Sequence, residues 1–309
     1  MPIPIREEDL PPVIWQRVQR NTSLLKRHRP IQAEALAKLR QQYRLWHTYN
    51  SNAIEGNTLS LRETQLVLEE GMTIGGKSLR EHLEAANTAA AFDRVWEAAR
   101  KGLRLDHVIL QELHGVVMRG ISEYAGRYRT HNVRIGGADH TPPQPSKIIR
   151  MLDQLFLDLE TDAEPVIKSI FQHHRLVFIH PFLDGNGRVT RLAANLMLLS
   201  DGYPPIVLRA ADRMRYYDCL RRADRGDYVP FAAFVLRAVD ESLTVYLSAV
   251  EDERALIPLS ELARNGPYSQ EYLSLRARQG VLEAVKIGDV WHSSRVALSE
   301  YIKWLRARR

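Results

Sequence analysis

The 309-residue chain has very little cysteine and no long apolar run. Its one cysteine, Cys219, excludes an internal disulfide framework and is typical of a reducing compartment. No stretch reaches the roughly 18 consecutive apolar residues of a membrane-spanning helix, and the N-terminus lacks the apolar segment of a secretory signal. These absences predict a cytoplasmic protein that makes no contact with a membrane.

The excess of positive over negative charge is also small. The 43 Lys and Arg residues nearly balance 37 Asp and Glu residues, which gives a net charge of +6. Such a balance helps a polyanionic ligand to bind but does not identify one. The length allows two or three structural units, and 45% hydrophobic residues are ordinary for a globular protein.

The densest group of chemically active side chains lies in residues 180–191, HPFLDGNGRVTR. Helix-like apolar segments flank this stretch, Pro165 to Ile179 before it and Arg188 to Leu199 after it. The loop therefore leads into a helix N-terminus, where about half a positive elementary charge favours anions. Gly185 and Gly187 are expected to adopt positive φ and to turn successive N–H groups inward. The pattern predicts a phosphate site.

The charged residues of this stretch support the same interpretation. Arg188 and Arg191 are three residues apart, so both guanidinium groups are expected to face one anion. Asp184 would repel a bare phosphate, which predicts an intervening Mg²⁺ that takes the carboxylate and phosphate oxygens. His180 is the group in this stretch that accepts a proton near neutral pH.

The stretch resembles the signature of the Fic family, HPFx[DE]GNGRxxR, at all nine specified positions. The resemblance implies a nucleotidyltransferase that transfers AMP from ATP to a Ser, Thr or Tyr hydroxyl of a target protein or of itself. It implies that His180 deprotonates this hydroxyl, that Asp184 holds Mg²⁺ and that Phe182 anchors the loop. It also implies a homodimer. The nucleotide-binding residues that it implies are Gly185, Asn186, Gly187, Arg188, Val189, Thr190, Arg191, Tyr217 and, less directly, Asp224.

A second short motif precedes the core at Ser51-Asn52-Ala53-Ile54-Glu55-Gly56. Ser51 and Glu55 are one helical turn apart before a Gly56-Asn57 helix stop, a pattern that by itself is also compatible with a surface glutamate. The segment resembles the inhibitory motif [ST]xxxE[GN] of the Fic family. This resemblance implies that Glu55 forms a bidentate pair with Arg191, displaces the γ-phosphate and leaves ATP misplaced for in-line attack.

Residues 126–143 interrupt the helical pattern. Val133, Arg134 and Ile135 have β character, Gly136-Gly137 forms a turn, and two prolines end the segment. We therefore expect a β-hairpin flap, formed by Val133, Arg134, Ile135 and Gly136, whose edge binds a target segment by strand addition. Fic proteins place a flap here, although an ordinary connecting hairpin is the alternative.

Several histidines and tyrosines lie near these motifs. The histidines lack the paired acidic or cysteine ligands of a zinc site, so we expect them to be hydrogen-bonded structural residues or polar loop residues. Tyr216 and Tyr217 are both candidates for stacking on adenine, and the resemblance favours Tyr217. The histidines in question are His131, His140, His173 and His174.

The chain is predicted to be mainly α, with an all-helical core and three regions. These are a helical region with the inhibitory motif at 1–100, the core at 101–250 and a C-terminal module at 256–309. The module follows the order helix, turn, helix, hairpin, helix, which is typical of a winged helix-turn-helix. Its second helix would offer polar residues to DNA, although acidic neighbours favour protein contact equally. These polar residues are Ser269, Gln270, Ser274, Arg276 and Arg278.

Two classes of function follow from these motifs. The first is a self-inhibited protein adenylyltransferase that uses ATP and Mg²⁺. The same site could also run in reverse as a de-AMPylase, with Glu55 positioning water. The second class is a winged-helix DNA-binding regulator whose Fic body senses a nucleotide. The intact signature favours the enzyme, because a sensor would not require His180.

Overall fold

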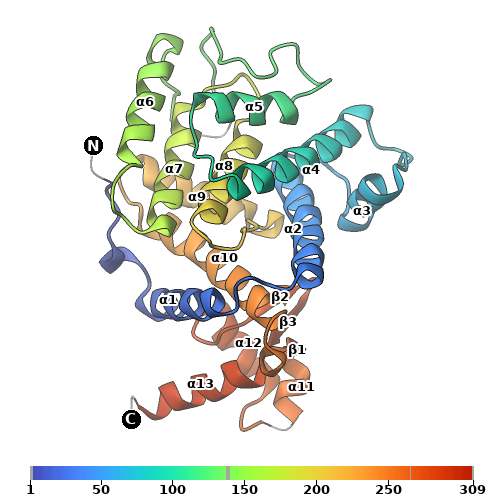
Figure 1. The fold of residues 1–309 in the computed structure, drawn as a ribbon, viewed down its shortest axis with the longest axis vertical. Helices are drawn as coiled ribbons and strands as arrows, with labels where there is room; N and C mark the ends of the chain where they lie inside the picture. The colour runs from blue at the N-terminus through green and yellow to red at the C-terminus, as the bar shows by residue number, and fades with distance from the viewer. Residues whose placement is uncertain (1–2, 137–139, 265, 308–309) are drawn as a thin grey trace. The chain divides into compact units, whose positions relative to one another are not determined.

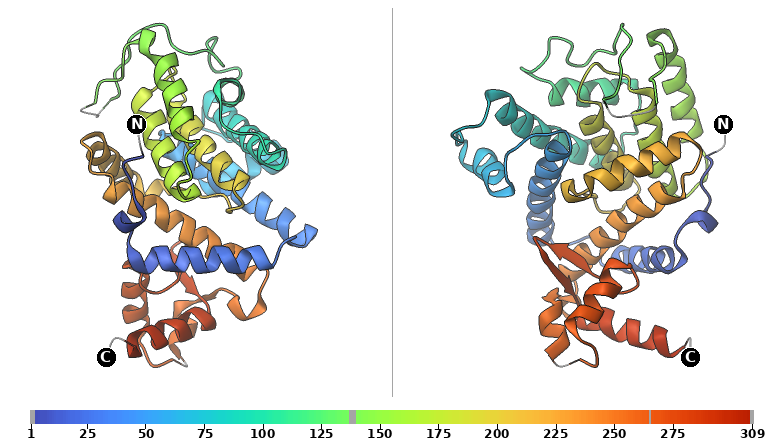
Figure 2. Two further views of the ribbon diagram at one scale, coloured as in Figure 1. Left: turned by 60° about the vertical axis from the view of Figure 1, so that its left-hand side comes forward. Right: turned by 180° about the vertical axis from the view of Figure 1, so that it is seen from behind.

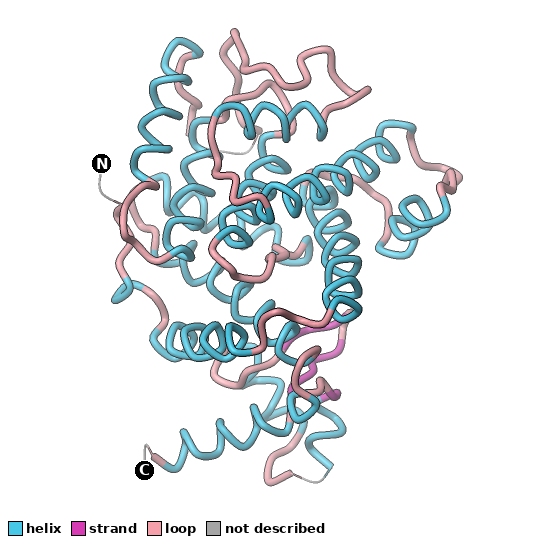
Figure 3. Tube along the Cα trace, in the orientation of Figure 1, coloured by secondary structure: helices cyan, strands magenta, loops and turns pink. Residues whose placement is uncertain are grey.

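The computed structural model describes residues 3–136, 140–264 and 266–307 (Figure 1). The mainly helical fold that the sequence predicts is confirmed, and strands occur in one small sheet in the C-terminal part of the described chain (Figure 3). No helix in these ranges is long and apolar enough to span a membrane. The α-helices are α1 (Pro12–Arg27), α2 (Ala33–Ile54), α3 (Leu61–Glu70), α4 (Leu79–Arg100), α5 (His107–Val117), α6 (Ile148–Asp158), α7 (Pro165–Ile179), α8 (Asn186–Ser200), α9 (Arg213–Asp224), α10 (Val229–Ser248), α11 (Leu259–Arg264), α12 (Gln270–Arg278) and α13 (Arg295–Arg306).

The chain forms two compact units, each discontinuous in sequence. The first comprises Met1–Asp9 and Gln41–Val235, and the second comprises Leu10–Arg40 and Leu236–Arg309. The three sequence regions with boundaries near residues 100 and 250 stay a prediction.

The first unit is built around α7 and α8. These two helices pack along each other, α4 and α5 cover α8, and α6 packs beside α7 (Figure 2). Leu192, Ala193 and Leu196 are buried at helical spacing along α8, as expected for a helix enclosed by others. The central position of α8 places its N-terminus, and the loop before it, inside the unit.

Local sequence explains where several helices begin. The side chains of Ser60 and Ser78 each accept a hydrogen bond from the backbone N–H of the glutamate three residues later. The carboxylate of that glutamate in turn accepts from the backbone N–H of the serine. These two capping boxes start α3 and α4. Pro165 occupies the first turn of α7, where its missing N–H has no helical partner to lose.

The segment between α5 and α6 is a long loop (Figure 3). Its described residues form no strand, so the β-hairpin prediction was wrong. The physical reason is that the polar groups of this loop bond to the end of α7: Arg129 donates to the carbonyl of His180, and His140 bonds to that of Phe178. The turn residue Gly137 lies outside the described residues.

The second unit combines α1 with the C-terminal elements. Strands β1 (Ile257–Pro258), β2 (Val285–Ile287) and β3 (Val290–Ser293) form an antiparallel sheet in the order β1-β3-β2. Leu259, Leu273 and Leu282 form the core of the C-terminal module. The expected order of helices and hairpin is observed, and the assignment as a winged helix-turn-helix stays a prediction.

A buried ion pair joins α1 to α10 within this second unit. Arg17 donates through Nε to Oδ1 of Asp240 at 2.8 Å and through Nη2 to the carbonyl of Gly280 at 2.9 Å. Both charged side chains are nearly inaccessible, at 7% and 6% exposure. A residue near the N-terminus and another 223 positions later therefore belong to one core.

Candidate active site

His180 occupies the end of α7 in a left-handed backbone conformation, with φ of 51°. It is the one non-glycine residue with positive φ among those described. Such a conformation is unfavourable for a side chain with Cβ, so the surroundings must hold it in place. His180 lines a pocket of the first unit.

The loop after His180 is rigidly anchored. Phe182 is fully buried and stacks on His114, with ring centroids 3.7 Å apart and planes 6° from parallel. The side chain of Asn186 closes the loop, because Oδ1 accepts from the N–H of Phe182 and Nδ2 donates to its carbonyl, both at 2.9 Å. Phe182 therefore acts as the anchor that the sequence implies.

The two glycines of the loop serve different purposes. Gly185 has φ of 75°, and a Cβ there would lie 2.8 Å from Sδ of Met118. Gly187 lies in the first turn of α8 without positive φ, so the expectation for this residue was wrong. A Cβ on Gly187 would instead collide with Oε1 of Glu55. Gly187 thus leaves room for an anionic oxygen at the helix N-terminus.

The pocket has a volume of about 500 Å³, within the range of ordinary small-molecule sites. It joins His180, Gly187 and Arg191 to one face of α9. The residues that line it from α9 recur at three- and four-residue steps, as expected for one helical face. They are Arg213, Met214, Tyr216, Tyr217, Leu220, Arg221 and Asp224.

Arg191 and Glu55 meet in this pocket. The Nη2 group of Arg191 donates to Oε1 of Glu55 at 2.7 Å. The expected bidentate pair is not formed, because Ser51 supplies the other acceptors: its Oγ accepts from Nε and its carbonyl from Nη2, both at 2.9 Å. Ser51 and Glu55, one turn apart at the end of α2, therefore hold Arg191 together.

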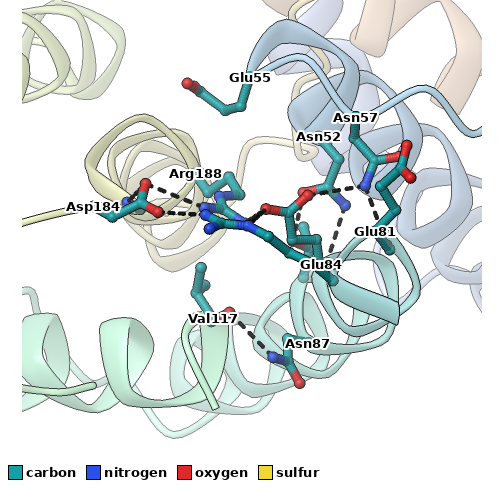
Figure 4. A network of polar contacts seen from close by, with 12 residues as sticks. Asn52, Glu55, Asn57, Glu81, Glu84, Asn87, Val117, Asp184 and Arg188 are labelled. Carbon is teal, nitrogen blue, oxygen red and sulfur yellow. Dashed lines mark hydrogen bonds and ion pairs between the residues drawn. The ribbon is translucent and has the colours of Figure 1, made fainter. Parts of the chain in front are cut away.

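Arg188 has a different environment. It is 2% exposed, and its Nη1 lies 3.2 Å from Oε1 of Glu84 on α4 (Figure 4). Glu84 also accepts from Nδ2 of Asn57 at 3.0 Å, two residues after Glu55. Arg188 does not line the pocket, so the two guanidinium groups do not face one anion. Its assignment as a nucleotide ligand stays a prediction.

Asp184 presents a half-exposed carboxylate just before α8. Its Oδ2 accepts from Nη2 of Arg80 at 2.6 Å, and its Oδ1 accepts from the N–H of Gly185 at 2.6 Å. The described residues contain no group of three His, Cys, Asp or Glu side chains placed to hold a metal. One carboxylate beside an anion site still fits Mg²⁺ ligated mainly by phosphate oxygens and water, provided that Arg80 moves away.

The surroundings of His180 keep its imidazole neutral. Burial lowers the pKa of His180 to about 4, and the nearby positive charge of Arg129 acts in the same direction. The carboxylate of Glu55 acts in the opposite direction. The ring is therefore neutral at pH 7, which is the form of a general base.

The remaining predicted site residues divide into those at the pocket and those in the core. Arg134, Ile135 and Gly136 line the pocket, whereas Val133 does not. Val189 and Thr190 are 1% and 2% exposed and pack inside the unit. Their predicted role in nucleotide binding is not tested by this placement.

The two neighbouring histidines of α7 each form a hydrogen bond with a side chain of α9. His173 bonds to the hydroxyl of Tyr216 at 2.8 Å, and His174 bonds to the carboxylate of Asp224 at 3.0 Å. Tyr216 is buried, whereas Tyr217 is only partly buried at the pocket, where the Arg213 guanidinium lies 5.5 Å from its ring centre. Tyr217 is therefore the better placed of the two for stacking on a base.

Four residues that shape the site were missed by sequence reasoning. Arg80 and Glu84 contact the charged residues of the loop, His114 stacks on Phe182, and Arg129 bonds to the backbone of His180. The four-residue spacing of Arg80 and Glu84 was a weak indication of a paired helix face. No local pattern marked His114 or Arg129, since their partners lie more than 50 positions away.

Comparison with known proteins agrees with this geometry. The Fic/DOC family profile matches residues 104–198, which include the whole loop from His180 to Arg191. The protein adenylyltransferase Fic of Drosophila willistoni is 34% identical over 230 residues, which are 73% of this chain and 46% of the relative. The chain thus spans about half the length of the curated relatives that it matches.

Solved structures extend the similarity to the fold. Fic-1 from C. elegans is 30% identical with a TM-score of 0.68, and the match covers 77% of this chain and 72% of that one. A Fic family protein from Desulfovibrio desulfuricans G20 is 25% identical with a TM-score of 0.66 and covers 95% of this chain and 98% of that one. With the unbroken loop signature and this shared fold, the chain belongs to the Fic/DOC family.

Proposed function

We propose that the chain is a self-inhibited protein adenylyltransferase, which transfers AMP from ATP to a hydroxyl side chain of a target protein. One observation carries the proposal: a proton acceptor, His180, shares a pocket with the anion-binding N-terminus of α8 and with Arg191. The similarity to proteins named protein adenylyltransferase Fic supports the same activity.

The pocket offers distinct places for the parts of ATP. The first-turn N–H groups of Asn186 and Gly187 and the guanidinium of Arg191 attract phosphates, while the face of Tyr217 suits the base. Asp184 does not line the pocket, but its carboxylate lies at the N-terminus of α8, and it is the residue to hold Mg²⁺. When bound, this ion would neutralise phosphate charge that Asp184 would otherwise repel.

His180 acts on the incoming hydroxyl. The hydroxyl oxygen forms a bond to the α-phosphorus, the bond from this phosphorus to the oxygen bridging the β-phosphate breaks, and pyrophosphate leaves. The hydroxyl proton passes to the imidazole, which is neutral and able to accept it. Arg134, Ile135 and Gly136 line the same pocket and are placed to contact the target segment.

Glu55 inhibits this reaction by occupying the phosphate position. Its Oε1 is 2.7 Å from Nη2 of Arg191 and lies directly over Gly187. The γ-phosphate cannot share that space, so bound ATP is held with its α-phosphorus misplaced for in-line attack by the target hydroxyl. A misplacement of about 1 Å is enough to cost roughly 10²-fold in rate.

The experiment is incorporation of AMP from labelled ATP and Mg²⁺ into proteins of a lysate. Glu55→Gly should raise labelling roughly 10²-fold, and Glu55→Gly with His180→Ala should abolish it. Glu123→Gly, at an exposed turn position, is the matched control and should label as wild type does.

Two results would contradict the proposal. Absence of labelling in Glu55→Gly would overturn AMP transfer. Removal of AMP from a modified protein by the wild type, without forward labelling, would establish the reverse reaction instead.

Partner contacts of the C-terminal module and a homodimer stay predictions. On α12, Gln270 and Arg278 are exposed and Ser274 is half-buried. Arg276 is engaged within the module, 4.7 Å from the ring centre of Tyr272 and 2.8 Å from Oε1 of Gln279. Contact between Arg276 and DNA would therefore require these contacts within the module to break.

A further inference from the structure

The carbonyl groups at the end of α7 are satisfied by the loop that follows α5. The carbonyl of Phe178 bonds to Nε2 of His140 at 2.9 Å, and that of His180 accepts from Nε of Arg129 at 2.8 Å. Between them, the carbonyl of Ile179 receives a long bond of 3.5 Å from Nη2 of Arg129. The backbone N–H of Arg129 donates to the carbonyl of Pro181 at 2.9 Å.

These groups are the ones that a helix leaves unsatisfied at its C-terminus. They also carry the partial negative charge of the helix dipole, which favours a cation. Arg129 therefore supplies the charge and the bonds to two of these three carbonyls, those of Ile179 and His180, while His140 bonds to that of Phe178.

Arg129 is unusual among the buried charges of this unit. It is 3% exposed, and no carboxylate in the described ranges forms an ion pair with it. Its guanidinium instead donates to carbonyl groups, including those of His131 at 2.9 Å and Pro143 at 2.6 Å. A buried cation is costly unless such bonds are complete, so its position is strongly determined.

The same guanidinium connects the catalytic histidine to the loop at the pocket. The bonds to His131 and Pro143 hold the two ends of the segment that carries Arg134, Ile135 and His140, which line the pocket. The bond to His180 reaches a residue in a left-handed conformation. A non-glycine residue in this conformation is unfavourable and is stable only when neighbouring bonds fix it.

We propose that Arg129 is a positioning residue, which fixes the left-handed backbone of His180, aims its imidazole and ties the pocket loop to it. Arg129 does not line the pocket, so it acts through His180 and the loop, not on the nucleotide. The kinetic part of its test rests on the proposed function, whereas the titration part does not.

The titration test follows the ring of His180 by NMR, with its signal assigned by comparison with His180→Ala. Arg129 and His140 lower the pKa of His180, while Glu55 and the carbonyl of Val177 raise it, and burial is the largest cause of its value of about 4. Arg129→Gln removes a positive charge and admits water. Both changes should move the titration of His180 upward toward its ordinary 6.5.

The kinetic test measures AMP transfer in the Glu55→Gly background. Arg129→Gln should lower kcat by roughly 10²-fold and leave KM for ATP within about twofold, because geometry is lost and not ground-state binding. Arg129→Lys should fail to restore kcat, since an ammonium cannot reproduce the fork that reaches four carbonyls. Arg127→Gln, an exposed change two residues earlier, is the control and should behave as the parent.

Three results would overturn the role of Arg129. They are a folded Arg129→Gln protein with unchanged His180 titration, a rise in KM alone, or full kcat in Arg129→Lys. If Arg129→Gln fails to fold by circular dichroism, Arg129→Lys decides the question. An inactive Glu55→Gly protein with Arg129 intact contradicts the proposed function, while the His180 titration still tests the positioning role.

Discussion

Each unit of the molecule contains a buried arginine that meets a carboxylate, and the two pairs differ in the exposure and the bonding of that carboxylate. In the second unit, the partner of Arg17 is Asp240, which is 6% exposed and bonded through both oxygens. In the first unit, the partner of Arg191 is Glu55, which is 32% exposed and bonded through one oxygen. Both arginines are themselves almost inaccessible, at 7% and 3% exposure.

The exposure of the carboxylate therefore separates the two pairs. Asp240 is almost inaccessible, so removal of either partner leaves a buried charge unpaired. Glu55 borders an open pocket and can leave Arg191 if another anion takes its place. The first pair stabilises a fold, whereas the second is suited to exchange with a phosphate.

The largest effect is expected from breaking the enclosed pair. Asp240→Asn should lower the free energy of unfolding by about 3–5 kcal/mol, because Arg17 remains buried without its counter-ion. Urea denaturation would measure the loss. Asp93→Asn breaks the partly exposed pair with Arg44 and should cost about 1 kcal/mol or less. Equal losses in the two variants would contradict the distinction.

Acid should affect the two units differently. Burial lowers the pKa of His47 and His173 to about 3 and of His114 and His180 to about 4, and all four lie in the first unit. The unfolded chain binds protons below pH 6.5 while these folded histidines stay neutral. Stability of this unit is therefore intact above pH 6.5 and falls as the pH drops toward 4.

At pH 5, about 1.5 units below the ordinary histidine pKa of 6.5, each of these histidines should cost about 2 kcal/mol of stability, since each unit is worth about 1.4 kcal/mol. In the second unit, burial raises the pKa of Glu283, so acid acts in the opposite direction on that group. Hydrogen exchange at pH 7 and pH 5 would compare the units, and His47→Gln should reduce the pH dependence of the first. Earlier loss of protection in the second unit would contradict this prediction.

The smallest effect on stability is expected from Glu55→Gln. A partly exposed single contact contributes little, so the unfolding free energy should change by less than about 1 kcal/mol. Nucleotide binding should respond more, with roughly tenfold tighter binding of a non-hydrolysable ATP analogue, because Arg191 regains a charge-assisted bond. Calorimetry would measure both quantities. A destabilisation as large as that of Asp240→Asn would show that this pair, too, is structural.

The features that sequence predicted well are encoded locally. The capping box of Ser60, the proline that opens α7 and the contiguous motif from His180 to Arg191 each depend on residues a few positions apart. The contact between Glu55 and Arg191 joins residues 136 positions apart, and it was anticipated only through family resemblance.

The features that sequence missed depend on distant partners. Spacing alone placed Arg188 beside Arg191, but Glu84, on another helix, draws the Arg188 guanidinium away. Residues 133–135 have β character, yet the loop bonds to α7 across about 50 positions and forms no ladder. Nothing in α1 indicated that Asp240 would be its partner.

The discontinuity of the second unit determines when the molecule can be completed during translation. Residues up to Arg40 leave the ribosome about 200 residues before Leu236 (236 − 40 = 196), an interval of about 10–40 s at ordinary elongation rates. Throughout this interval the Arg17 side chain and the apolar face of α1 lack the elements against which they pack. The segment that contains the pocket, Gln41–Val235, emerges in full before them. A nascent chain therefore has the residues of its His180 pocket before it has its second unit, and α1 spends this interval without the helix against which it packs.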